Sequence, residues 1–141
     1  MKIEISTKKD FADFAKPRIA EGIYLAKLKD VKDIKDGKFG PRMAFIYTVM
    51  DKASATEVEL ALVCYKKQAN TSNGLGQILS AHGVDVEAEN APVVDTDALV
   101  GSVVRAYVED YEYEKVDEKT QQKSKVTASA IRKVKAKDSV N

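Results

Sequence analysis

The stretch that decides the fold is residues 58–83, VELALVCYKKQANTSNGLGQILSAHG. Residues 58–66 form an apolar run rich in residues that favour strands, so they predict a β-strand. The period then changes, because four side chains fall at helical spacing. These are Leu75, Ile78, Leu79 and His82, with Gly83 as the terminating residue and Thr71, Ser72 or Asn73 as the N-cap. The stretch therefore predicts one short helix after a strand.

Two further strands are predicted on the N-terminal side of this stretch. Residues 23–31 carry apolar side chains on both faces, which indicates a barrel strand buried inside and partly covered outside. Residues 43–50, MAFIYTVM, are β-branched and aromatic and predict the next strand. Between them Asp36-Gly37 predicts a hairpin turn, since glycine adopts positive φ without steric cost.

Two more strands are predicted on the C-terminal side, over residues 102–113 and 126–134. The acidic segment 84–97 is irregular, residues 97–100 predict a single helical turn, and residues 114–125 predict a loop or a frayed hairpin tip. The elements therefore run strand, strand, strand, helix, strand, strand. This order predicts an all-β domain with one helix, folded as a five-stranded OB-type barrel whose helix plugs one end. An SH3-like barrel is the main alternative, but it does not need the helix.

The domain boundaries follow from these elements. We expect an OB domain over residues 19–134, preceded by an N-terminal arm or short helix (1–18) and followed by a polar tail (135–141). The 141 residues carry one cysteine, Cys64, and one histidine, His82. We interpret Cys64 as a buried structural thiol and His82 as a residue at the edge of the core. Phosphate-loop, dinucleotide, zinc and calcium motifs are missing, so we expect a non-catalytic protein with no cofactor and no metal.

The location of the protein is also an expectation from the sequence. There is no apolar run long enough to span a bilayer and no apolar segment typical of a secretory signal. We therefore expect no membrane association and a cytoplasmic protein, in the host cytoplasm if the chain is viral.

The charge is unevenly distributed along the chain, although the net charge is only +1. Residues 24–50 sum to +3, residues 51–110 to −6 and residues 111–141 to +3. In an OB fold the ligand lies across the second and third strands, between the loop that joins strands one and two and the loop that joins strands four and five. The two basic parts coincide with these loops, so the sequence predicts an anionic ligand there.

Aromatic side chains lie between the basic residues of the same segments. Phe39 lies between Lys38 and Arg42, and it has a functional interpretation as a base-stacking platform beside an alternative as a residue folded onto the barrel rim. Flanking cations would neutralise phosphates. The candidate nucleic-acid-binding residues are Lys27, Lys38, Phe39, Arg42, Tyr47, Tyr65, Lys66, Lys67, Tyr111 and Lys115.

Three segments together resemble the OB-fold single-stranded-DNA-binding proteins of phages and related mobile or archaeal replicons. The matching residues are Gly22 and Tyr24; Gly37, Lys38, Phe39 and Gly40; Phe45 and Tyr47; Leu75, Ile78 and Leu79; and Leu99, Val100 and Gly101. The resemblance covers roughly residues 22–134. It implies sequence-independent binding of single-stranded DNA in replication, recombination or repair, with replication or recombination proteins as partners. The tail KAKDSVN is not acidic, so recruitment through an acidic tail is not implied.

Other interpretations stay open at this point. OB barrels also bind proteins, so an interaction module without nucleic-acid binding is the alternative, with the acidic residues 51–110 as its surface. A nuclease would need Arg42 or Arg105 with Asp51 or Asp110 around a metal ion, and no spacing supports it. RNA is as open as DNA. A homodimer is a further expectation, because the N-terminal arm or the segment between strands four and five could pair with a second chain.

Overall fold

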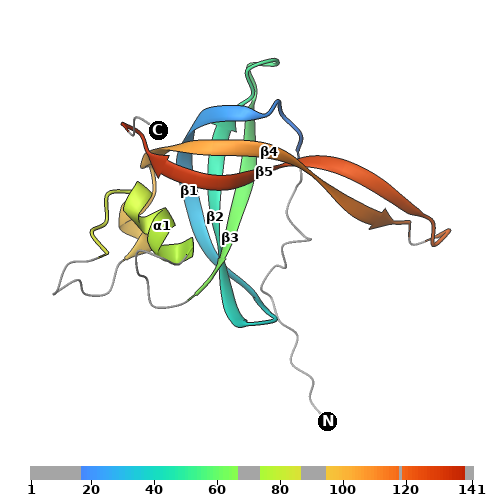
Figure 1. The fold of residues 1–141 in the computed structure, drawn as a ribbon, viewed down its shortest axis with the longest axis horizontal. Coiled ribbons are helices and arrows are strands. Elements are labelled where there is room, and N and C mark those ends of the chain that lie inside the picture. The colour runs from blue at the N-terminus through green and yellow to red at the C-terminus, as the bar shows by residue number, and fades with distance from the viewer. Residues whose placement is uncertain (1–16, 67–73, 87–94, 118, 139–141) are drawn as a thin grey trace, which may run out of the picture.

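The computed structural model describes residues 17–66, 74–86, 95–117 and 119–138. Within them the chain forms five antiparallel strands and one α-helix (Figure 1). These are β1 (Gly22–Gly37), β2 (Gly40–Met50), β3 (Glu57–Tyr65), α1 (Gly74–Ala81), a 3₁₀ turn η2 (Thr96–Leu99), β4 (Val103–Val116) and β5 (Lys123–Ala136). The predicted β-rich domain, with its helix between the third and fourth strands, is confirmed.

The five strands belong to one sheet in the order β3-β2-β1-β4-β5. The edge strands β3 and β5 approach each other, and α1 packs against both of them. No backbone ladder joins β3 to β5 among the described residues. The sheet is therefore curved and covered by the helix, but hydrogen bonds do not close it into a barrel.

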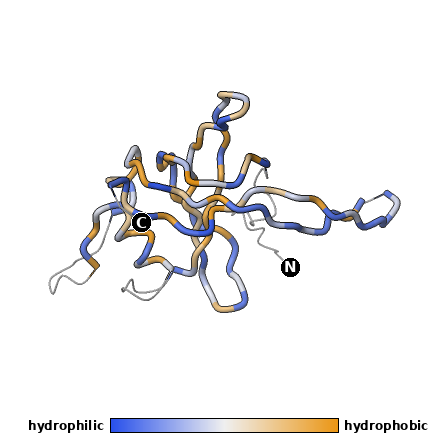
Figure 2. Tube along the Cα trace, turned by 45° about the horizontal axis from the view of Figure 1, so that its top comes forward, coloured by the Kyte–Doolittle hydropathy of each residue, from blue (hydrophilic) through white to orange (hydrophobic). Residues whose placement is uncertain are grey.

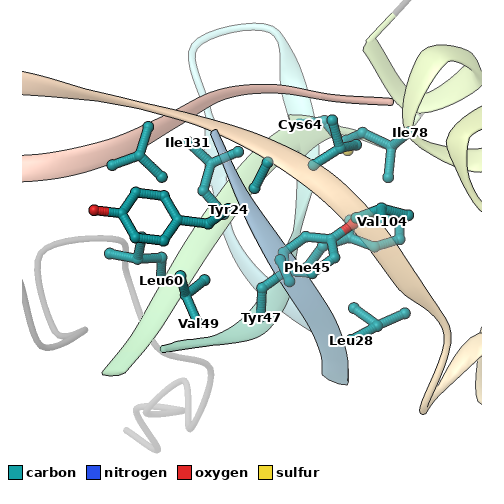
Figure 3. Packing of buried hydrophobic residues seen from close by; sticks show 14 of the residues in the cluster. Tyr24, Leu28, Phe45, Tyr47, Val49, Leu60, Cys64, Ile78, Val104 and Ile131 are labelled. Carbon is teal, nitrogen blue, oxygen red and sulfur yellow. The ribbon is translucent and has the colours of Figure 1, made fainter. Parts of the chain in front are cut away.

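The core lies between the two halves of this sheet and α1 (Figure 3). On β2 every second side chain joins it, and these side chains are Met43, Phe45, Tyr47 and Val49. Strand alternation explains the pattern, because residues two apart lie on the same face. Fully burying a large apolar side chain contributes about 1.5–3 kcal/mol, so this stripe fixes which face of β2 points inward.

The helix supplies the other wall of the core. Leu75, Ile78 and Leu79 are buried in it, as the helical spacing predicts. Cys64 is buried beside the start of α1, and burial raises the pKa of its thiol to about 11. The prediction of a buried structural thiol is thus confirmed. The predicted N-cap residues 71–73 lie outside the described residues.

The β1–β2 hairpin turns two residues later than predicted. β1 continues to Gly37, which pairs with Gly40, so that Lys38 and Phe39 form the turn. Gly40 has a φ of 115°, a conformation that favours glycine. The prediction of a turn at Asp36-Gly37 was therefore wrong. The glycine with positive φ is Gly40, which follows the turn.

The β4–β5 hairpin is longer than predicted and projects from the sheet as an arm (Figure 1). Strand pairing continues to Val116 and Lys123, and beyond it the N–H of Asp117 donates to the carbonyl of Gln122 at 2.9 Å. Half of the segment 114–125, predicted as a loop or a frayed hairpin tip, is therefore strand. Figure 2 shows that the tip of this arm is hydrophilic.

Residues 17–21, which we call the N-terminal strap, cross the base of this arm. The backbone N–H of Ser129 donates to the carbonyl of Pro17 at 3.0 Å, and the N–H of Ile19 donates to Ser129 Oγ at 2.8 Å. The Ser129 hydroxyl donates in turn to the carbonyl of Ile19 at 3.1 Å. Arg18 pairs with Asp110 at 3.0 Å. Residues 17 and 18 of the predicted N-terminal arm thus contact the sheet, and residues 1–16 lie outside the described residues.

Candidate nucleic-acid interface

Five of the predicted site residues lie together at the end of the β1–β2 hairpin. We call them the tip cluster: Lys38, Phe39, Arg42, Tyr65 and Lys66. Phe39 lies in the two-residue turn and is 70% exposed. Its ring contacts Tyr65 edge-on, with centroids 5.7 Å apart and planes inclined by 69°. The exposed ring of Phe39 in the turn and the half-buried ring of Tyr65 on β3 thus meet at the hairpin tip.

The strand register brings Tyr65 to the hairpin. Arg42 on β2 lies opposite Tyr65, the last residue of β3. The N–H of Lys66 then donates to the carbonyl of Pro41 at 2.8 Å and fixes the end of β3. Gly37 completes the arrangement, because a Cβ there would lie only 2.7 Å from Arg42 Cδ and from the Tyr65 hydroxyl. A side chain at position 37 would therefore displace the side chains of Arg42 and Tyr65 from this arrangement.

Three cations surround the two rings. Lys38 Nζ lies 5.6 Å from the centroid of Phe39, a cation–π contact. Arg42 Nε donates to the carbonyl of Lys35 at 3.1 Å, which orients the guanidinium. Lys66 Nζ lies 3.3 Å from Asp33 Oδ1, but both side chains are about half exposed. Exposed ion pairs contribute little to stability, so Lys66 can exchange Asp33 for another anion at small cost.

Tyr47 does not belong to this surface. Its side chain is fully buried, so the prediction that Tyr47 contacts nucleic acid was wrong. Its hydroxyl bonds to His82 Nε2 at 2.7 Å, and His82 Nδ1 bonds to the Ser102 hydroxyl at 3.0 Å. We call these three residues the Tyr47 network. Burial raises the pKa of the Tyr47 phenol and lowers the pKa of His82, and both shifts favour the neutral form.

The remaining predicted residues lie apart from the tip cluster. Lys27 is exposed on β1, opposite Val103 on β4, toward the other end of the strand. Tyr111 and Lys115 lie on the arm, which points in a different direction from the β1–β2 hairpin (Figure 1). The Tyr111 ring packs on Tyr113 with centroids 5.8 Å apart. Lys67 lies outside the described residues.

The arm is also less basic than predicted. Residues 111–125 contain four lysines and four acidic residues, so their charges cancel. The positive charge of the C-terminal part resides further along β5, at Arg132, Lys133 and Lys135, and at Lys137 directly after it. Lys133 and Lys135 lie over the ring of Tyr107 on β4. The sequence pattern missed this second basic surface, because it depends on the register between β4 and β5.

The described residues hold no group of three or more histidine, cysteine, aspartate or glutamate side chains arranged to bind a metal ion. Asp51 accepts from Ala53 N–H and the Ser54 hydroxyl within its own loop, and Asp110 pairs with Arg18. Asp51 and Asp110, the carboxylates considered for a nuclease, thus each interact with other groups of the protein. In the same part of the chain no helix has the length and apolarity needed to cross a membrane.

Comparison with known proteins adds no family to this description. No protein-family model matches the chain, and no curated protein matches its sequence. The function of the chain is therefore inferred from the tip cluster and its surroundings.

Proposed function

We propose that this chain is a non-catalytic OB-type protein that binds single-stranded DNA largely independently of sequence. The observation that carries the proposal is the exposed ring of Phe39 at the hairpin tip, packed against the half-buried Tyr65 and accompanied by cations. Stacking a base on an aromatic side chain contributes about 1–3 kcal/mol and accepts any base. A stacking surface of this kind therefore suits a single strand whose bases are contacted without discrimination between base types.

The cations of the tip cluster supply the second part of the binding. Lys38 lies over the Phe39 ring, Arg42 lies opposite Tyr65 and Lys66 follows Tyr65 in the chain, so phosphates of a stacked strand would pass near these cations. Each phosphate that a cation neutralises releases condensed counterions, which makes binding strongly dependent on salt. The cluster thus combines stacking with electrostatic attraction, as expected for a binder of single strands.

The fold supports the same proposal. The strand order, the helix after β3 and the approach of β3 to β5 are the arrangement expected of an OB barrel. In such a barrel the β1–β2 loop borders the ligand-binding face. We place the main contact at this hairpin and the adjoining ends of β2 and β3, and not on the neutral arm.

Fluorescence titration with oligo-dT of about 25 nucleotides tests the proposal, since one OB fold covers about 4–16 nucleotides. We expect micromolar or tighter binding at about 50 mM salt and a clear loss at about 200 mM. Oligo-rU and oligo-dA of the same length measure preference for sugar and base. Absence of micromolar binding to every oligonucleotide at low salt would contradict the proposal. Light scattering on the same sample determines whether the protein is a homodimer.

A further inference from the structure

A second surface lies on the outer face of β1, β4 and β5. Two cross-strand rows define it: Ile23, Tyr107 and Lys133 in one row, and Leu25, Arg105 and Lys135 in the next. Lys27 lies beyond them on β1. We call these seven residues the β1–β4–β5 face. Their sequence neighbours Tyr24, Ala26, Val104, Ala106 and Val134 are buried in the core, so the seven side chains point away from it.

Two aliphatic side chains on this face are exposed to solvent. Ile23 is 44% exposed and Leu25 is 59% exposed. Both side chains are therefore only partly covered, as the sequence predicts for the outer side of β1. A single exposed aliphatic residue is ordinary, but two adjacent ones beside a tyrosine form an apolar strip that a partner can cover.

The charges within these two rows have one sign, while Glu21 and Glu109 lie in the next row beyond Ile23 and Tyr107. The two rows contain Arg105, Lys133 and Lys135 but no acidic residue, and Lys27 adds a fourth cation. The nearest acid along β4 is Glu109, which pairs with Arg132 at 3.0 Å. The partner that complements this surface therefore combines apolar side chains with negative charge.

Nucleic acid fits this face less well than protein does. Lys133 Nζ and Lys135 Nζ lie 4.7 Å and 5.8 Å from the centroid of Tyr107, so cations already occupy positions over the ring where a base would stack. Ile23 and Leu25 offer no aromatic surface. In the tip cluster a single cation, Lys38, lies 5.6 Å from the centroid of Phe39, and 70% of Phe39 is exposed.

We infer that the β1–β4–β5 face docks an acidic segment of a partner protein, with aliphatic or aromatic side chains between its carboxylates. The apolar side chains cover Ile23 and Leu25, and the carboxylates pair with Lys133, Lys135 and their neighbours. A groove of about 410 Å³ between α1 and β5 continues this surface, since Lys133 and Lys135 line it together with Gly76, Ser80, Ala81 and Val86. The inference is independent of the proposed binding of single strands.

The test uses the full chain and a fluorescent peptide of about twelve residues, in which aspartate and glutamate alternate with leucine and phenylalanine. Two comparison peptides replace either the apolar residues by serine or the acids by lysine. The variant Lys133→Glu with Lys135→Glu removes the cations of the face. Its matched control is Lys123→Glu with Lys125→Glu, because that pair has the same spacing and charge change on the exposed part of β5 in the arm.

We expect Lys133→Glu with Lys135→Glu to weaken binding of the acidic, apolar peptide about tenfold or more and the control pair to leave it nearly unchanged. Leu25→Ser provides a second variant that does not depend on charge, with Val116→Ser on the arm as its control, since Val116 is 45% exposed. Both comparison peptides should bind weakly. Backbone amide shifts at Ile23, Leu25 and Tyr107 should accompany binding of the first peptide.

Three results would overturn the inference: no binding of the acidic, apolar peptide; equal weakening by the two charge-reversed pairs; or amide shifts on this face caused by oligo-dT and not by the peptide. The last result would assign the face to nucleic acid. Phe39→Ala separates the two proposals, because it should weaken oligo-dT binding and leave peptide binding unchanged.

Discussion

The tip cluster and the Tyr47 network use the same kinds of residue in opposite ways. Both contain a tyrosine on the β2–β3 part of the sheet, and the sequence assigned both tyrosines to a ligand. At the tip, Phe39 is 70% exposed and contacts Tyr65 on the surface. Tyr47 is fully buried, and its hydroxyl is bonded to His82. The comparison teaches that the face of the strand, and not the residue type, decides whether an aromatic side chain is available.

The roles of the two regions follow from this difference. The Tyr47 network joins β2 to the residue after α1 and to Ser102 before β4, so it holds the helix against the sheet. Its rings stack, since Tyr47 and His82 are 5.8 Å apart and inclined by only 12°. The tip cluster joins the ends of β1, β2 and β3, where little of the core depends on it. Substitutions in one region should change stability, and substitutions in the other should change binding.

The largest expected effect is on stability at Tyr47. Tyr47→Ala removes a fully buried ring and leaves His82 without its partner, so we expect a loss of about 3–5 kcal/mol in the free energy of unfolding. Tyr47→Phe removes only the hydroxyl and should cost about 1–3 kcal/mol. Urea denaturation followed by circular dichroism measures both. A loss below about 0.5 kcal/mol for Tyr47→Ala would show that Tyr47 does not belong to the core.

The next effect is on binding at Phe39. Phe39→Ala should weaken oligo-dT binding by about 1–3 kcal/mol, because it removes the exposed stacking surface. Stability should change by less than about 0.5 kcal/mol, as for other exposed positions. Tyr113→Ala on the arm is the matched control and should leave the affinity nearly unchanged. Equal losses for Phe39→Ala and Tyr113→Ala would mean that the tip has no special role.

A smaller effect is expected at Lys38. Lys38→Ala should reduce the slope of log K against log salt by about 0.7, the contribution of one phosphate contact on a single strand. Phe39→Ala should leave this slope unchanged, since it removes no charge. Lys119→Ala on the arm removes an equal charge and should alter the slope much less. The measurement is a titration with oligo-dT at several salt concentrations, and equal slopes for Lys38→Ala and the native chain would argue against a phosphate contact.

The smallest effect is a pH dependence of stability from His82. Burial lowers the pKa of folded His82 below its ordinary value of about 6.5, so the unfolded chain binds more protons at mildly acidic pH. The stability contributed by neutral His82 is complete above about pH 6.5 and decreases as pH falls below it. Thermal melts between pH 7 and 5 should show this decrease. His82 is the only histidine in the chain, so His82→Gln should make stability depend less on pH between 7 and 5. An unchanged pH dependence in this variant would contradict a buried, neutral His82.

The sequence predicted the elements well because periodicity identifies them locally. The apolar run before the helix and the spacing of Leu75, Ile78 and Leu79 were sufficient to place β3 and α1. A usable signal for Tyr47 was also present, since it shares parity with Phe45 and Val49, and the stripe they form is buried. For Tyr47, strand parity predicts burial correctly, whereas its aromatic character suggests contact with a ligand and is misleading.

The β1–β4–β5 face could not be predicted in the same way. Its rows depend on which residues of β1, β4 and β5 lie opposite one another, and a register shift between Tyr107 and Val108 alters the pairing with β5. Charge sums over long segments also hid the contrast between the neutral arm and the basic end of β5. Lysines near Tyr107 come from a strand about 25 residues away, so no local pattern contains them.

The N-terminal strap has a consequence for how the protein is made. The hydrogen bonds between Ile19 and Ser129 join residues 110 positions apart. Ribosomes deliver the N-terminus first, so Ile19 emerges long before its partner exists. The strap can dock only after β5 has been synthesised, and contacts of such long range slow folding. We therefore expect docking of the strap on Ser129 to be a late step in folding.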